Sequence, residues 1–374
     1  MRFFEFKDPL IQEGGKSSGR RYNSEIAILC AIAGVDISTF DPSAPEQTLP
    51  PEVFDNPKAV YSDIKKLLAP DFEPELFQKW YDAGGNYAQV INAKMSEHGS
   101  QIGQLSWAGG KNKADNAADI GFIGSDIAGI SVKAEGGITL ANLTPKALGL
   151  TPEKGSDIFY HYAQKEFKDM KIKIFTDVLN QAKKSPGQVI APITDKYTIV
   201  YDPNTDKYTC KGKKTITADA QTILNAVAKN SSWQRVFGDW FQANWQAKKA
   251  YATPLFTKIA KAFEVTIEQT LQQNSSLMNM LRFADKPYFY ISTTGLYYVP
   301  SLDEVQDLKL MGLKYGEPDG TSQLFVAQIG RPDSEAYAEL DIYVRYANGM
   351  FEANPTVRVQ TLRNPQYISW EKLV

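Results

Sequence analysis

The stretch ADIGFIGSDIAGISVKAEGG, residues 118–137, decides the fold of this chain. Apolar and polar side chains alternate along two short runs, which predicts a β-hairpin, and we centre its turn on Asp126. Side chains on a strand point alternately to the two faces of a sheet. The register expected for this hairpin pairs residue 119 with 133, 121 with 131, and 123 with 129.

The two faces of the predicted hairpin differ in character. One face is apolar and suited to a core, with Ile120, Phe122, Ile130 and Val132. The other face carries Asp119, Gly121, Ser131 and Lys133. Directly opposed residues hold their Cβ atoms about 4.5–5.5 Å apart. We therefore expect Asp119 and Lys133 to meet on the polar face, with open space beside Gly121.

An Asp and a Lys on neighbouring strands are typical of a metal-dependent phosphodiesterase. The Asp offers a hard oxygen to Mg²⁺, and the metal polarises a phosphoryl oxygen and activates water. The Lys orients that water or offsets the charge that develops on the phosphate. The alternative is an ordinary surface ion pair between strands, worth about 0.2–1 kcal/mol.

The amino-acid composition excludes several classes of protein and metal site. The chain has 374 residues, 43% of them hydrophobic, which is enough apolar mass for a core. Two cysteines and two histidines exclude a disulfide framework, a four-cysteine zinc site and a His-rich metal hydrolase. The formal net charge of −2 excludes a uniformly basic surface for nucleic acid but allows a local one.

Two segments resemble the PD-(D/E)XK nuclease superfamily. The first runs from WAGGKNKADNAADI (107–120) through GISVK (129–133) to NLT (142–144), and the second is DIYVRYANGMFEANPTVRVQTLRNPQYISWEKL (341–373). More narrowly, they look like large phage-encoded members. The resemblance implies a restriction-endonuclease-like core, a mixed β-sheet flanked by helices, and DNA endonuclease activity that depends on Mg²⁺ or Mn²⁺. Asp119 would bind the metal and Lys133 would serve the water or the phosphate.

The chain departs from the motif at two positions. Ala118 stands before the Asp where a Pro is usual, and Ser131 stands where the acid of the (D/E)XK motif is usual. The S-x-K form resembles a subset of restriction enzymes that supply the missing acid from elsewhere in the fold. Ser131 could hold a metal-bound water or could simply pack.

The displaced acid has three candidates. Glu25 lies in a predicted helix, where many members of the superfamily place a metal-binding Glu; the alternative is an exposed helix acid. Glu135 shares the strand parity of Lys133, although Gly136 and Gly137 indicate that the strand is ending. Glu97, near the end of its helix, is expected to be solvated.

The wider pattern predicts an α+β fold. We expect helices over 20–34, 59–69, 73–83, 86–97 and 157–184, strands within 100–141, a hairpin over 195–217, helices over 219–284, and an antiparallel sheet from 287 onward. The predicted domains are a nuclease-like core (1–285), which includes a basic hairpin and helical insertion (188–284), and a C-terminal β-rich lobe (286–374).

The DNA contacts are predicted from charge. Residues 160–262 hold 17 Lys and Arg but 8 Asp and Glu, which is typical of a phosphate-contacting face or of solvated helices. The candidate contacts are Lys111, Lys113, Lys211, Lys213 and Lys214. An aromatic stripe over 233–245 could stack bases, but the core face of a helix is the favoured interpretation.

The sequence has no apolar run long enough for a membrane span, and we find no secretion signal in it. We therefore expect a cytoplasmic protein, located in the host cell if it is phage-encoded. DNA is the expected partner, and a homodimer is left open. The alternative function is a catalytically inactive protein with a nuclease fold, which binds DNA or acts as a phage structural or interaction protein.

Overall fold

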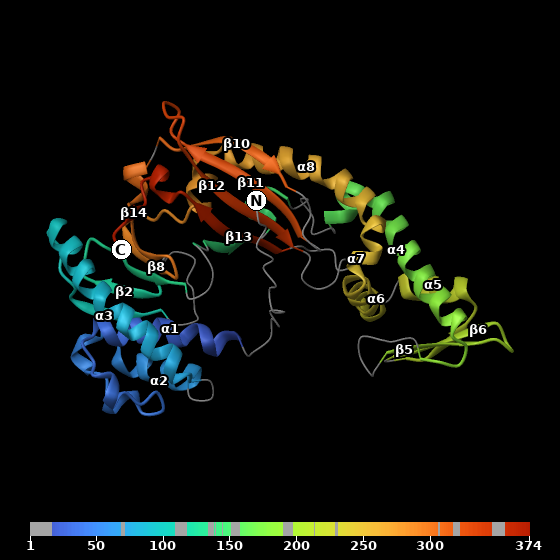
Figure 1. Cartoon of the computed structure of the whole chain (residues 1–374), viewed down its shortest axis with the longest axis horizontal. Coiled ribbons are helices and arrows are strands. Elements are labelled where there is room, and N and C mark those ends of the chain that lie inside the picture. The colour runs from blue at the N-terminus through green and yellow to red at the C-terminus, as the bar shows by residue number, and fades with distance from the viewer. Residues whose placement is uncertain are drawn as a thin grey trace.

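The computed structural model has an α+β architecture, which confirms the predicted fold class (Figure 1). Three β-sheets and several helices follow one another along an elongated molecule. The structure describes residues 17–68, 72–108, 118–133, 138, 140–143, 145–150, 158–189, 197–212, 214–228, 231–305, 307–316, 322–345 and 356–374.

The helices of the described residues fall in two stretches of the chain. The N-terminal helices are α1 (Ser17–Ile32), α2 (Pro57–Leu68) and α3 (Pro74–Glu97). The central helices are α4 (Ile158–Lys184), α5 (Ala220–Ala228), α6 (Ser231–Ala243), α7 (Trp245–Lys248), α8 (Thr253–Leu271) and α9 (Asn274–Met280).

The first sheet is mixed and has the order β1-β2-β3-β8-β9-β14. Its strands are β1 (Gln104–Trp107), β2 (Ile120–Ile123), β3 (Gly129–Val132), β8 (Tyr288–Ser292), β9 (Gly295–Val299) and β14 (Glu371–Lys372). β3 and β8 are parallel, and the other neighbours are antiparallel. Because β3 and β8 run parallel, the chain between them must travel away from the sheet and return.

The N-terminal helices cover one face of this sheet (Figure 1). Residues of α1, α2 and α3 share a buried cluster with Ile120, Phe122, Ile130 and Val132, as expected for the apolar face of the hairpin. The two helices predicted over 73–83 and 86–97 form the single helix α3. A Cβ at Gly84 would lie 2.7 Å from the Cβ of Ala31, so glycine here lets α3 approach α1 closely.

The second sheet is antiparallel and has the order β10-β11-β12-β13-β4. Its strands are β10 (Lys309–Tyr315), β11 (Ser322–Gly330), β12 (Tyr337–Arg345), β13 (Thr356–Arg363) and β4 (Ala141–Leu143). α8 packs on β10 and β11. Both sheets combine strands from before and after residue 285. The first sheet pairs β3 with β8, and the second pairs β4 with β13, so both sheets span the predicted domain boundary.

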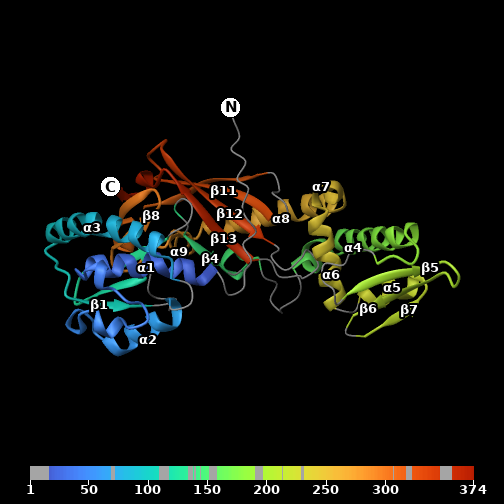
Figure 2. The same ribbon diagram turned by 60° about the horizontal axis from the view of Figure 1, so that its bottom comes forward.

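The third sheet lies at the far end of the molecule, beside α4 and α5 (Figures 1 and 2). It consists of β5 (Thr198–Asp202), β6 (Lys207–Lys211) and β7 (Ile216–Ala218). β5 and β6 form the predicted hairpin, and its turn is stabilised by hydrogen bonds from Asn204 N and Thr205 Oγ1 to the Asp202 carboxylate. Among the described helices, none is both long and apolar enough to cross a bilayer.

Candidate functional site

Asp119 immediately precedes β2 and is held there by backbone bonds on both sides. Its N–H donates to Ile130 O at 2.8 Å, and its C=O accepts from Ala108 N at 3.0 Å. Because Ile120 points into the helix-covered core, alternation sends the Asp119 side chain to the opposite face. Ser131 and Gly121 belong to the same face, so the sequence pattern alone selects the polar side of the sheet.

Three donors converge on one oxygen of the Asp119 carboxylate. Oδ2 accepts from Ser131 Oγ at 3.1 Å, from Val132 N at 2.8 Å and from Lys133 Nζ at 2.9 Å. No hydrogen bond from any described residue reaches Oδ1. The carboxylate replaces a main-chain carbonyl as the acceptor for Val132, which ties the start of β2 to the end of β3.

The ion pair at the end of the hairpin is largely withdrawn from water. The side chains of Asp119 and Lys133 are 6% and 14% exposed. The surface-pair alternative is therefore wrong, because charges removed from water interact far more strongly than exposed ones. The predicted contact between these two residues is confirmed.

The predicted register of the hairpin is wrong by two residues. The structure pairs Ile120 with Ile130 and Gly121 with Gly129, so the turn centres on Ser125 rather than Asp126. Ser125 Oγ accepts from Ile127 N within the turn, and Ser125 O accepts from Lys286 Nζ at 2.7 Å. A slip of two residues preserves which face each side chain occupies, so Asp119 still reaches Lys133, now diagonally across from it.

The open space predicted beside Gly121 is occupied by Ser106 of β1. These two residues pair directly across the sheet, and a Cβ at Gly121 would lie 2.4 Å from Ser106 Oγ. The polar face is therefore filled at this position, and the predicted space is wrong.

We expect Gly121→Ala to lower the free energy of unfolding by about 1–3 kcal/mol, the usual cost of overpacking. Combining it with Ser106→Ala should remove the loss, because the Ser106 Cβ would lie 3.7 Å away, an ordinary contact. Urea denaturation of the single and double variants measures this. If the second substitution gives no recovery, the Ser106 hydroxyl is not the obstacle.

The candidates for the displaced acid have different surroundings. Glu25 in α1 is buried, with 2% exposure, so the exposed-acid alternative is wrong. Glu97 is exposed and lies 3.1 Å from Lys94, which confirms that it is solvated. Glu135 lies outside the described residues. Within the described part of the chain, no group of three or more His, Cys, Asp or Glu side chains is arranged to hold a metal ion.

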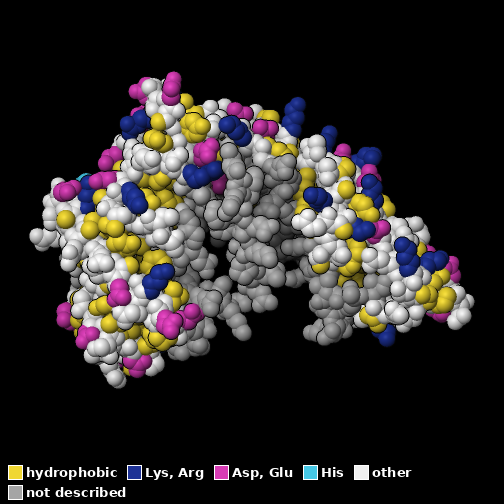
Figure 3. Space-filling view, viewed as in Figure 1, with side chains coloured by type: hydrophobic (Ala, Val, Ile, Leu, Met, Phe, Trp, Pro, Cys, Tyr) yellow, Lys and Arg dark blue, Asp and Glu magenta, His cyan; other side chains and the backbone are white. Residues whose placement is uncertain are grey.

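Of the five predicted DNA-contacting lysines, the structure describes Lys211 and Lys214, and both lie far from Asp119. Lys211 and Lys214 are exposed on and beside β6, which lies at the opposite end of the molecule from β2 in both views (Figures 1 and 2). Lys111, Lys113 and Lys213 lie outside the described residues. Dark blue Lys and Arg side chains gather on the end that holds α4 and β6, whereas magenta acids dominate around α2 (Figure 3).

The aromatic stripe of α6 forms part of the core, which confirms the favoured interpretation. Trp233, Phe237, Trp240 and Phe241 are all buried. Lys171 of α4 packs against this helix: its Nζ lies 4.0 Å from the Phe167 ring centroid and donates to Gln234 Oε1 at 3.0 Å. Lys171 belongs to the basic segment 160–262, but it is buried and so does not add to an exposed basic surface.

Tyr288 and Arg282 were not predicted as site residues from the sequence. Tyr288 of β8 directly precedes Phe289, the partner of Ile130 in β3, and its hydroxyl donates to Arg282 O at 3.1 Å. Burial raises the pKa of the Tyr288 hydroxyl. The positive charge of Arg282 lowers this pKa, and the negative charge of Asp119 raises it. Arg282 has a left-handed backbone, φ 62°, a strained conformation that is often found near functional sites.

Comparison of the chain with protein-family models, with curated proteins and with solved structures found no match.

Proposed function

We propose that this chain is a metal-dependent endonuclease of the PD-(D/E)XK type that hydrolyses phosphodiester bonds in DNA. One observation carries the proposal: Lys133 Nζ lies 2.9 Å from Asp119 Oδ2, and Ser131 donates to the same oxygen. The three residues come from two adjacent strands of a mixed sheet that helices cover. This is the arrangement that the resemblance implies for a nuclease core.

The donor set is compatible with Mg²⁺ or Mn²⁺. Mg²⁺ is commonly bound by one or two carboxylates, with waters and substrate phosphate oxygens completing its shell. Asp119 Oδ1 is the oxygen available for this role, since the donors from the described residues all reach Oδ2. A bound metal would polarise the scissile phosphate and lower the pKa of a water molecule. Glu25 and Glu135 stay the proposed sources of a second carboxylate.

The protein's own groups would divide the remaining work. The hydrogen bonds from Ser131 and Val132 fix the orientation of the Asp119 carboxylate, so little rearrangement is needed when a ligand arrives. Lys133 would donate a hydrogen bond to the attacking water or to a phosphate oxygen. In a site withdrawn from bulk water, such a donor is worth about 10²–10³ in rate.

The direct test is a plasmid cleavage assay with and without divalent metal. We expect nicked or linear products with Mg²⁺ or Mn²⁺, and none with excess EDTA. Absence of cleavage of plasmid, single-stranded and linear DNA under all metal conditions would contradict the proposal.

The second candidate function is a catalytically inactive nuclease fold that binds DNA or a protein partner. It is favoured by the three donors on Asp119 Oδ2 and by the lack of a three-acid cluster in the described residues. Under this alternative, DNA binding would weaken with salt but no product would form. DNA binding that is absent at every salt concentration would instead favour a protein partner.

We also propose that the protein acts on DNA in a reducing cytoplasm, in the host cell if the chain is phage-encoded. Cys30 and Cys210 are both free and buried, which is compatible with such a compartment.

A further inference from the structure

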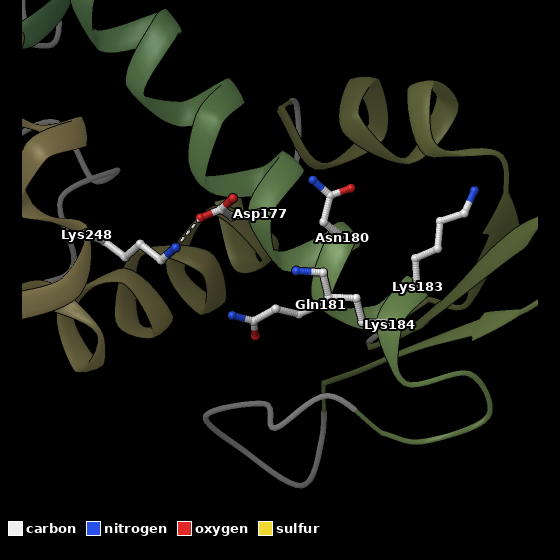
Figure 4. Close-up of a pocket in the computed structure, with 6 residues that line it drawn as sticks. All are labelled: Asp177, Asn180, Gln181, Lys183, Lys184 and Lys248. Carbon is white, nitrogen blue, oxygen red and sulfur yellow. Dashed lines mark hydrogen bonds and ion pairs between the residues drawn. The ribbon is translucent and has the colours of Figure 1, made fainter.

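A pocket lined by polar and charged side chains lies near the C-terminal end of α4, at the other end of the molecule from β2 (Figure 1). Figure 4 shows the residues that line it. Its volume is about 330 Å³, and its lining side chains are Asp177, Asn180, Gln181, Lys183, Lys184 and Lys248. Five of these six residues belong to α4, and Lys248 comes from α7. In Figure 4, Lys248 faces Asp177, and Gln181 and Lys184 extend beside this pair.

The acid in the pocket is already neutralised. Asp177 Oδ2 accepts from Lys248 Nζ at 2.6 Å and from Tyr251 OH at 2.7 Å. Burial raises the pKa of Asp177, but the hydrogen bonds from Lys248 and Tyr251 lower it. The lowering effects together outweigh the effect of burial, so the pKa of Asp177 lies below its usual value. Asp177 is thus ionised at neutral pH, and it pairs directly with Lys248, while the charge of Lys184 acts on it more weakly.

The remaining two lysines leave the pocket positively charged. Lys183 Nζ lies 3.1 Å from Asp206, but both side chains are more than half exposed, so this pair is weak. Lys184 makes no hydrogen bond or ion pair with any described residue. The amides of Asn180 and Gln181 add donors that carry no charge.

These features select the chemistry of a ligand. Pockets for apolar ligands are lined mainly by hydrophobic and aromatic side chains, whereas every lining residue here is polar or charged. Ammonium and amide donors around a positive centre match the oxygens of a phosphate group. The Asp177 carboxylate is paired with Lys248, so it repels a bound phosphate only weakly.

We propose that this pocket binds a phosphate ester, supplied by a nucleic-acid backbone or by a free nucleotide. Lys184 supplies a charge that no direct ion pair with a described residue neutralises, and Asn180 and Gln181 supply hydrogen bonds. The proposal does not depend on cleavage at Asp119.

Binding is measured by fluorescence anisotropy on the full chain in EDTA, with a labelled single-stranded oligonucleotide and with labelled ATP as separate probes. We expect Lys184→Gln to weaken binding of the true ligand by about tenfold, the effect of losing one charged hydrogen bond. The matched control is Lys173→Gln, which removes an exposed lysine of the same helix outside the pocket.

The two probes separate the two sources of phosphate. Weaker oligonucleotide binding with Lys184→Gln but not with Lys173→Gln supports a backbone phosphate, and the same result with ATP supports a nucleotide. If wild-type protein binds neither probe, or if both variants lose affinity equally, the pocket is not a phosphate site. Because EDTA prevents metal-dependent cleavage, failure of the nuclease proposal leaves this result intact. Circular dichroism confirms that both variants are folded.

Discussion

Lys133→Ala is expected to lower the free energy of unfolding by about 3–5 kcal/mol, the cost of removing one partner from a buried ion pair. The substitution leaves the Asp119 carboxylate, which is 6% exposed, without its countercharge. The hydrogen bonds from Ser131 and Val132 remain, but they do not neutralise the charge. Urea denaturation followed by circular dichroism measures the loss.

The chain offers an exposed ion pair as the matched control. Lys165 Nζ lies 2.7 Å from Asp169, a separation similar to that in the buried pair, but these side chains are 83% and 49% exposed. Lys165→Ala should therefore cost at most about 0.5 kcal/mol. The double variant Asp119→Ala with Lys133→Ala should lose less than the sum of the single losses, since neither charge is then stranded. Equal losses for Lys133→Ala and Lys165→Ala would contradict the buried character of the site.

Asp119→Asn is expected to reduce metal-dependent DNA cleavage by about 10²–10³-fold or more. The amide keeps the shape of the side chain but has no negative charge to hold a divalent cation. Lys133→Met, which preserves much of the side-chain length, should cause a loss of similar size by removing the charged donor. Initial rates of plasmid nicking at saturating Mg²⁺ give both values.

The control for charge alone is Glu97→Gln. Glu97 is an exposed acid of α3 that forms an ion pair with Lys94, so its loss should leave cleavage unchanged. Each variant is assayed below its own unfolding temperature, so that lost activity is not lost fold. Full activity in Asp119→Asn would exclude Asp119 as the metal ligand and would mean that the residues responsible for cleavage lie elsewhere in the chain.

The local pattern predicted the hairpin better than its register. Alternation assigned Ile120 and Ile130 to the core, and that assignment survives a slip of two residues because parity is preserved. The turn centre was misplaced because its position depends on Ser125, whose carbonyl is held by Lys286 from a distant part of the chain. Such a contact leaves no trace in a short window of sequence.

The length of α3 shows a second limit of local patterns. The Gly84-Gly85 pair suggested a break between two helices, because glycine weakens a helix. The structure instead uses Gly84 where α1 and α3 approach, so packing outweighs the local propensity. The α+β fold class could be predicted because it follows from local sequence patterns. The strand order could not be predicted, because it depends on contacts between segments that are distant in the sequence.

The surroundings of Asp119 were only partly predictable. Ser131 and Lys133 follow within a few residues, and the spacing of a strand brings them together. Tyr288 belongs to β8, which reaches the hairpin through its parallel pairing with β3, and no motif in the sequence predicts that pairing. The displaced acid could not be identified from the sequence, because it depends on which of the candidate acids the fold brings close to Asp119.

The parallel pairing of β3 with β8 also constrains biosynthesis. On the ribosome, β3 is complete long before β8 has been made, so one side of a wholly buried strand has no partner during that interval. Unpaired apolar edges invite association with other chains. A nascent chain arrested before residue 288 is therefore expected to require a chaperone, and production at lower temperature should favour correct assembly.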